Sequence, residues 1–169
     1  FVEDPLAPED VGYFDNLRRE TTAPIAMGEL FNNPNEWTRL VSERLLAFIR
    51  VHMSQVGGVS PARKMAAMCE CFGGRTAWHG PGDVSPVGHA ANVHLDLAVP
   101  NFGIQEAHGF CQAEIDCFPG CPELRDGYFH ANDSPGLGID IDEELAAKFP
   151  VTDDPPFDLF WGNIRNPDG

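Results

Sequence analysis

The sequence has few basic residues and no long hydrophobic run. Lys and Arg together number 11, against 26 Asp and Glu, and the formal net charge at pH 7 is -15. Because binding to nucleic acid needs clustered positive charge, this composition argues against a nucleic-acid partner. No apolar segment approaches the roughly 20 residues that would cross a bilayer, and no basic segment leads into an apolar one as in a secretory signal. We therefore expect a cytoplasmic protein with no membrane partner.

Paired cysteine motifs are also missing. The five cysteines are odd in number and lack the C-x-x-C spacing of a zinc site, so reduced thiols are the simplest interpretation. The chain of 169 residues is long enough for one core. It opens on Phe1 inside an apolar run and without an initiator Met, and we expect a fragment whose N-terminal portion is absent.

What the sequence does contain is a series of five short apolar runs, each ending at a polar residue. These end residues are Glu3, Glu29, His52, His79 and Glu106. The steps between them are 26, 23, 27 and 27 residues, about the length of one strand, one crossover helix and two loops. Such crossovers join parallel strands and place all their carboxyl ends on one side of the sheet. The spacing thus predicts that the five polar side chains gather where barrels and open α/β sheets carry active sites.

Helix signals occupy the segments between the runs. Helices are expected to begin near Pro8, Asn33-Pro34, Ser60-Pro61 and Ser85-Pro86, because a capping side chain or a proline suits the first turn. The last of these helices is expected to bury Ala90, Val93 and Leu97. The order βαβαβαβαβ predicts an α/β fold with a parallel sheet, which we assign to residues 1–109 as half of a barrel with five strands and four helices.

Residues 110–169 lack this period and are expected to form a C-terminal extension that packs on the barrel. A hairpin is expected around Gly127-Tyr128-Phe129, and a short helix capped by Asp142 is expected to run to Phe149. The apolar residues beyond Pro150 are expected to anchor the tail on another part of the protein.

Glu3 and Glu29 follow neighbouring strands of the predicted sheet. Neighbouring strands lie about 4.8 Å apart, so carboxylates at their ends can bind one cation, and hard oxygen ligands suit Mg²⁺. Other interpretations remain open, because Glu3 precedes an Asp4-Pro5 turn and Glu29 follows a glycine and could be solvated.

Four further side chains are candidates for ligand binding. Arg50 offers a planar fork for a carboxylate, although with His52 it could equally belong to a structural ion pair. His79 opens a Gly-Pro-Gly loop and can exchange a proton near neutral pH. Asp83 could orient a hydroxyl or serve only the next helix start, and Glu106 could bind a polyhydroxylated ligand or pair with an Arg. The remaining histidines are interpreted as structural: His89, His94, His108 and His130.

Taken together, these motifs resemble the enolase superfamily. The segments that carry the resemblance are 1–5, 27–29, 50–52, 79–83 and 102–106, with 135–140 and 154–159 near the end. Within this mandelate racemase/muconate lactonizing enzyme-like superfamily, the chain is similar to the D-mannonate dehydratase subgroup, which includes starvation-sensing homologues. The resemblance covers essentially all 169 residues.

This resemblance implies the C-terminal part of a modified TIM (β/α) barrel, with the N-terminal capping domain and the first strands lying upstream. Glu3 and Glu29 would bind the essential Mg²⁺. The sugar acid would contact a second set of residues, namely Glu29, Arg50, His79, Asp83 and Glu106. The first metal ligand and the acid–base residues would also lie upstream, so the fragment alone would be inactive and His79 is only a weak catalytic candidate.

The implied reaction is dehydration of D-mannonate or D-gluconate to 2-keto-3-deoxy-D-gluconate, by abstraction of the α-proton and loss of the β-hydroxyl. Pro81 stands where D-mannonate-active members tend to carry Ala, and the Pro form resembles members that act weakly, act on D-gluconate or lack a clear dehydratase role. Two other interpretations stay open: an acid-sugar racemase or epimerase, and a regulatory homologue without turnover. Family members also suggest a homo-oligomer for the full-length protein.

Overall fold

The computed structural model describes residues 1–150 of the chain. The expected packing of the tail and the family-like segment 154–159 lie outside these described residues. Four short strands form one parallel sheet in the order β1-β2-β3-β4, with the bounds β1 Val2–Glu3, β2 Ile25–Met27, β3 Phe48–Ile49 and β4 Arg75–Thr76. Each strand pairs in parallel with the next along the chain, so all four carboxyl ends point the same way, as the spacing predicts.

The fifth predicted strand is reduced to a single parallel bridge between Thr76 and Phe102. Two successive amides, those of Gly103 and Ile104, donate to the same carbonyl of Thr76, so the ladder does not advance along the partner strand. The next carbonyl, that of Trp78, accepts from the side chain of Gln105 at 3.1 Å. Because a side-chain amide replaces the backbone donor there, the predicted five-stranded sheet has four strands and a bridge.

Along the chain, the helices alternate with the strands, as expected. They are the 3-10 helix η1 Pro8–Tyr13 followed by α1 Phe14–Glu20, then α2 Pro34–Ser42, α3 Val59–Cys71 and α4 Pro86–Ala98. Two predicted caps are confirmed. Asn33 forms a capping box with Glu36 at the start of α2, and the hydroxyl of Ser85 accepts from the Gly88 amide at 3.2 Å.

Two helix details differ from the sequence prediction. Helix α3 begins two residues earlier than expected, because the Gly58 carbonyl already accepts from the Ala62 amide and places Ser60 inside the first turn. In α4, Ala90 and Val93 are buried, but Leu97 is 73% exposed. Leu97 instead borders an apolar cavity of about 420 Å³, which residues of the hairpin β5–β6 also line.

The hydrophobic core lies between the sheet and the helices that follow its strands. It combines residues of β2 and β3 with the inner faces of α1, α2 and α3; its fully buried large members include Phe14, Ile25, Met27, Phe31, Leu40, Ile49, Met65 and Trp78. This rigid support holds the strand ends in place. Within residues 1–150, no helix combines the length and the hydropathy that a bilayer span requires.

The segment after residue 109 contains a helix that the sequence prediction missed, α5 Gln112–Cys117. It begins at a capping box in which the Cys111 amide donates to Glu114 at 2.7 Å. The expected hairpin is present as β5 Glu123–Arg125 and β6 Tyr128–His130, joined through Asp126 and Gly127, both with positive φ. Helix α6 Glu143–Ala146 is shorter than expected, and Asp142 caps it.

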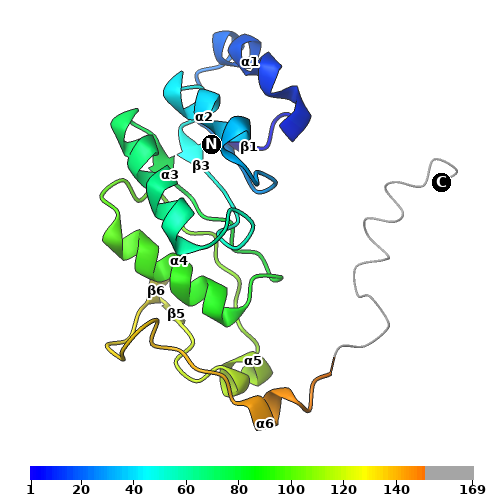
Figure 1. Ribbon diagram of the computed structural model, residues 1–169, viewed down its shortest axis with the longest axis vertical. Helices are drawn as coiled ribbons and strands as arrows, with labels where there is room; N and C mark the ends of the chain where they lie inside the picture. The colour runs from blue at the N-terminus through cyan, green and yellow to red at the C-terminus, as the bar shows by residue number, and fades with distance from the viewer. Residues whose placement is uncertain (151–169) are drawn as a thin grey trace, which may run out of the picture.

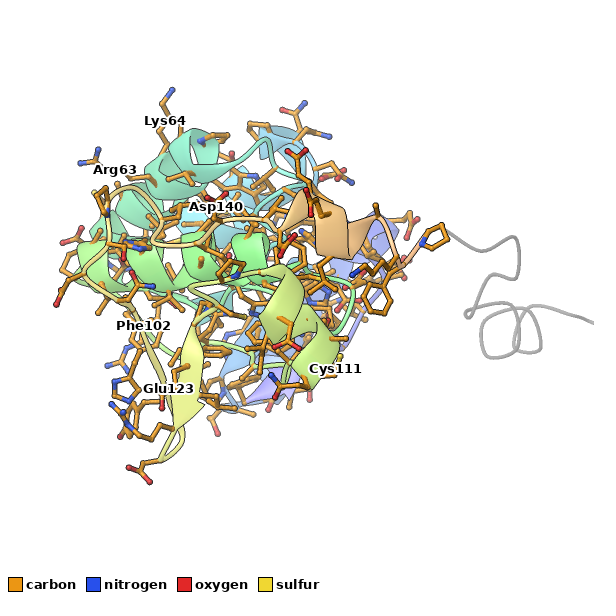
Figure 2. The ribbon with its side chains drawn as sticks, turned by 90° about the horizontal axis from the view of Figure 1, so that it is seen from below. Arg63, Lys64, Phe102, Cys111, Glu123 and Asp140 are labelled. Carbon is orange, nitrogen blue, oxygen red and sulfur yellow. The ribbon has the colours of Figure 1, made fainter. Side chains whose placement is uncertain are left out.

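Both views place this segment beside α4. Figure 1 shows β5, β6 and α5 next to that helix, and Figure 2 shows the hairpin at Glu123 and the start of α5 at Cys111 on the same side of it. The contact is made by aromatic rings, since His89 of α4 lies 5.1 Å from the ring of Phe110 and 5.7 Å from that of Phe129.

Candidate active site

Three carboxylates meet at the carboxyl ends of β1 and β2. One oxygen each of Glu3, Asp4 and Glu29 lies within 4.8 Å of the other two. The two predicted ligands therefore lie at the same end of the sheet and close enough to share one cation. Three hard oxygen donors in this arrangement fit a Mg²⁺ ion, which usually keeps several waters or substrate oxygens in its own shell.

Asp4 is the member of this group that the sequence interpretation placed only in a turn. Strand alternation puts Asp4 on the face opposite Glu3, but its backbone has a φ of 40° and leaves the extended conformation at once. The pKa of Asp4 is raised to about 6, first by burial and then by the charge of Glu29, while the Gly28 backbone and Arg50 act in the opposite direction. Accumulated negative charge of this kind favours binding of a cation.

Arg50 is the centre of the adjacent charge network. Its side chain is 5% exposed, and one guanidinium nitrogen donates to Glu29 at 2.8 Å. The other nitrogen donates to Glu106 at 2.6 Å and lies 3.2 Å from Glu3. Arg50 thus joins the carboxylates that follow β1 and β2 to that of Glu106. These contacts are ion pairs, as in the alternative interpretation of Arg50 and Glu106.

His79 lies against the same guanidinium. Its Nδ1 is 2.7 Å from Arg50, and since a guanidinium only donates hydrogen bonds, this nitrogen must be the acceptor and the ring proton must lie on Nε2. Burial and the charge of Arg50 lower the pKa of His79, outweighing the opposite effects of Glu106 and Glu29. Near neutral pH His79 is therefore an uncharged ring with an N–H to offer, which suits hydrogen bonding to a hydroxyl.

Glu106 reaches the network although its segment is not a full strand. Besides the contact with Arg50, its Oε2 accepts from the backbone amide of Gly80 at 2.7 Å. A side chain at position 80 would collide with the carbonyl oxygen of Glu106, so glycine is needed for this close approach. The loop that begins at His79 is thereby attached to the end of the neighbouring segment.

Asp83 and His52 lie apart from the Arg50 network. They line, together with Ser54 and one side of His79, a hollow of about 180 Å³. Strand β3 ends at Ile49, so His52 lies three residues beyond the strand end. The ring of His52 nevertheless lies 5.5 Å from that of His79, and its Nδ1 is 2.8 Å from the Ser54 hydroxyl.

Open space adjoins the carboxylates on two sides. A cavity of about 360 Å³ is bordered by Asp4 and Glu29, and a second of about 180 Å³ is bordered by Glu3, Arg50 and Glu106. The structure therefore brings four of the predicted residues and Asp4 together around space for a small ligand, with His79 beside them and Asp83 one hollow away.

Most of the chain matches one known family. A family model described as "Enolase C-terminal domain-like" matches residues 1–145. The chain belongs to this family. The predicted membership of the enolase superfamily is confirmed, as is the α/β fold of a barrel half.

Relatives within the family are closely similar in sequence. Two D-galactonate dehydratase family members, from Enterocloster bolteae and Salmonella enteritidis, are 52% and 54% identical over the whole chain. The chain spans 41% and 40% of their lengths. These descriptions name galactonate, so the D-mannonate specificity suggested by the resemblance finds no support in them.

Solved structures show the same fold. An enolase from Pantoea ananatis with bound D-gluconate and Mg is 56% identical, with a TM-score of 0.88 over 89% of this chain and 36% of that one. A mandelate racemase/muconate lactonizing enzyme from Jannaschia sp. is 28% identical, with a TM-score of 0.82 over 90% of this chain and 39% of the other.

Proposed function

We propose that the full-length protein is a Mg²⁺-dependent sugar-acid dehydratase that forms a 2-keto-3-deoxy sugar acid. The observation that carries this proposal is the convergence of Glu3, Asp4 and Glu29 at one end of the sheet. D-gluconate is the first substrate to test, because the Pantoea ananatis relative binds it and because Pro81 departs from the D-mannonate pattern. A cytoplasmic location and a homo-oligomeric state belong to the same proposal.

The carboxylates of Glu3 and Glu29 would hold the ion, with Asp4 beside them. Bound to the substrate carboxylate, Mg²⁺ supplies stabilisation of the negative charge that develops when the α-proton is removed. Removal of that proton is the difficult step, since a proton next to a carboxylate is very weakly acidic. The acid–base residues expected upstream by the family resemblance would carry the proton itself.

The residues of this chain would bind and orient the sugar acid. Arg50 keeps the carboxylates of Glu29 and Glu106 in place and offsets their charge. Arg50 and Gly80 both bind Oε2 of Glu106, which leaves Oε1 to accept from a substrate hydroxyl. The Nε2–H of His79 would donate to a second hydroxyl, a role for which the neutral ring is better suited than for acid catalysis.

The decisive experiment uses the full-length protein with Mg²⁺ and D-gluconate, D-galactonate or D-mannonate, and measures the 2-keto-3-deoxy product. Glu3→Gln and Glu29→Gln should each lower the rate by at least about 100-fold, because the charge needed to hold the ion is lost. Glu43→Gln, at an exposed carboxylate after α2, is the matched control and should leave the rate unchanged.

Two outcomes would contradict the proposal. An epimerised sugar acid without keto product would favour the racemase interpretation. Binding of sugar acids without any turnover, together with a biological effect that survives the double Glu3→Gln and Glu29→Gln change, would favour the regulatory one.

A further inference from the structure

We propose that α4 positions the His79–Gly80 backbone for substrate binding through three polar side chains, the buried His89 and Asn92 and the partly buried Asp96, which we name the α4 seam. The effect expected on kcat rests on the proposed function. The effect expected on amide exchange at Gly80 does not.

Each seam residue lies beside a different residue of the segment 78–80. Asp96 lies beside the indole of Trp78, and the Asn92 amide donates to the His79 carbonyl at 3.3 Å. His89 is packed so closely against the next residue that a Cβ on Gly80 would lie 2.9 Å from its ring. The spacing i, i+3, i+7 places the three on one face of the helix, running antiparallel to the segment they contact.

Stability alone does not explain polar residues at these positions. His89 and Asn92 are 0% and 1% exposed. One oxygen of Asn92 is buried with no hydrogen-bond partner among residues 1–150, while His89 is held against the backbone of Pro81 and Asp96 against the side chain of Trp78. Burying polar atoms in this way is costly, and apolar residues of similar size would pack there at lower cost.

Buried side chains on the rest of α4 are not polar. The other buried α4 side chains away from the seam are apolar, namely Pro86, Ala90, Val93 and Leu95. Polar burial is therefore confined to the face beneath residues 78–81. That segment carries the His79 ring against Arg50 and the Gly80 amide against Glu106. A small displacement of this backbone would break both contacts.

The test is made in the full-length protein with Asn92→Asp, which keeps the side-chain shape and removes the N–H donor. Hydrogen–deuterium exchange should show the Gly80 amide exchanging at least about 10-fold faster, because its bond to Glu106 opens more often. The kcat for sugar-acid dehydration should fall about 10- to 100-fold, as expected for misplaced binding groups. Asn92→Gln, which keeps the amide donor, should recover part of both losses.

Val93→Ala is the matched control, since it removes buried atoms from the same helix turn without touching the seam. It should lower the melting temperature and leave kcat and Gly80 protection unchanged. If Asn92→Asp does not fold, His89→Asn is tested in its place. It should raise the exchange rate of the Gly80 amide in the same way.

The inference is overturned if the seam variants lower the melting temperature as Val93→Ala does, with wild-type kcat and Gly80 exchange. Failure of the proposed function is distinguishable from this result. In that case the wild type turns over no sugar acid, and exchange at Gly80 still decides whether the seam positions the segment.

Discussion

The two parts of the described chain are held together in different ways. Residues 1–109 contain a continuous core in which large side chains of the strands and helices are fully buried. Between residues 110 and 150, only Cys117 and Pro122 are buried. Hydrophobic burial therefore positions the strand ends that carry the carboxylates, whereas the extension depends on local bonds and on its contact with α4.

Local bonds in the extension centre on Asn132. Its amide donates to the carbonyls of Gly120 and Gly138 at 3.1 and 2.8 Å and closes a small loop between them. From α4, the Nε2 of His94 lies 3.2 Å from the Leu137 carbonyl, and His89 contacts Phe129. The extension is thus attached to the helix that also carries the seam.

The largest expected effect is at Arg50. Replacing it by Met leaves three carboxylates of the barrel half without their shared cation, so the full-length protein should lose about 3–5 kcal/mol of unfolding free energy. In the extension, Arg125→Met removes only an exposed pair with Glu123 and should leave denaturant unfolding unchanged. Equal losses from the two substitutions would contradict the contrast between the regions.

The second-largest difference between the two regions is expected when a leucine of each is truncated. Leu40 is 0% exposed, and Leu40→Ala should cost about 3 kcal/mol because a cavity remains in the barrel half. Leu124 of the hairpin is 48% exposed, and Leu124→Ala should cost less than about 1 kcal/mol. Urea unfolding of both variants measures this difference, and a larger loss for the hairpin variant would show that the extension has a core of its own.

A pH effect is expected at Asp96. Burial raises its pKa to about 8 against the opposing contact with Trp78. Because the folded state holds this proton more tightly than the unfolded chain, stability is full below about pH 4 and is lost as the pH rises toward 8. Asp96→Asn should remove about 2 kcal/mol of the decline between pH 6 and 8, measured by urea unfolding at each pH. An unchanged pH slope would show that Asp96 is already ionised.

The smallest effect is expected at Asn132. Its replacement by Ala removes two hydrogen bonds at an exposed site and should cost at most about 1 kcal/mol. The loss should be local: hydrogen–deuterium exchange should rise around residues 120 and 138 and stay unchanged in β1–β4. Faster exchange at Gly80 as well would mean that the extension supports the site more directly than its contacts with α4 indicate.

Much of the site was predictable from regular spacing. Glu3, Glu29 and Glu106 recur at crossover intervals, and parallel crossovers bring such ends together whatever the side chains between them. The capping roles of Asn33 and Ser85 were equally predictable, because capping depends on residues within one helical turn. Asp4 was not predictable, since its place depends on a left-handed backbone that an alternating pattern does not reveal.

The sequence by itself determined the order of strands and helices, the shared end of the strands and the family. Local propensity and hydrophobic period specify these properties without knowledge of distant contacts. Only the tertiary structure decided that Gln105 would replace a strand bond, that Arg50 would join three carboxylates, and that His89 and Asn92 would lie beneath the His79 loop. Those outcomes depend on groups far apart in the chain, whose distances are set by how the helices pack on the sheet.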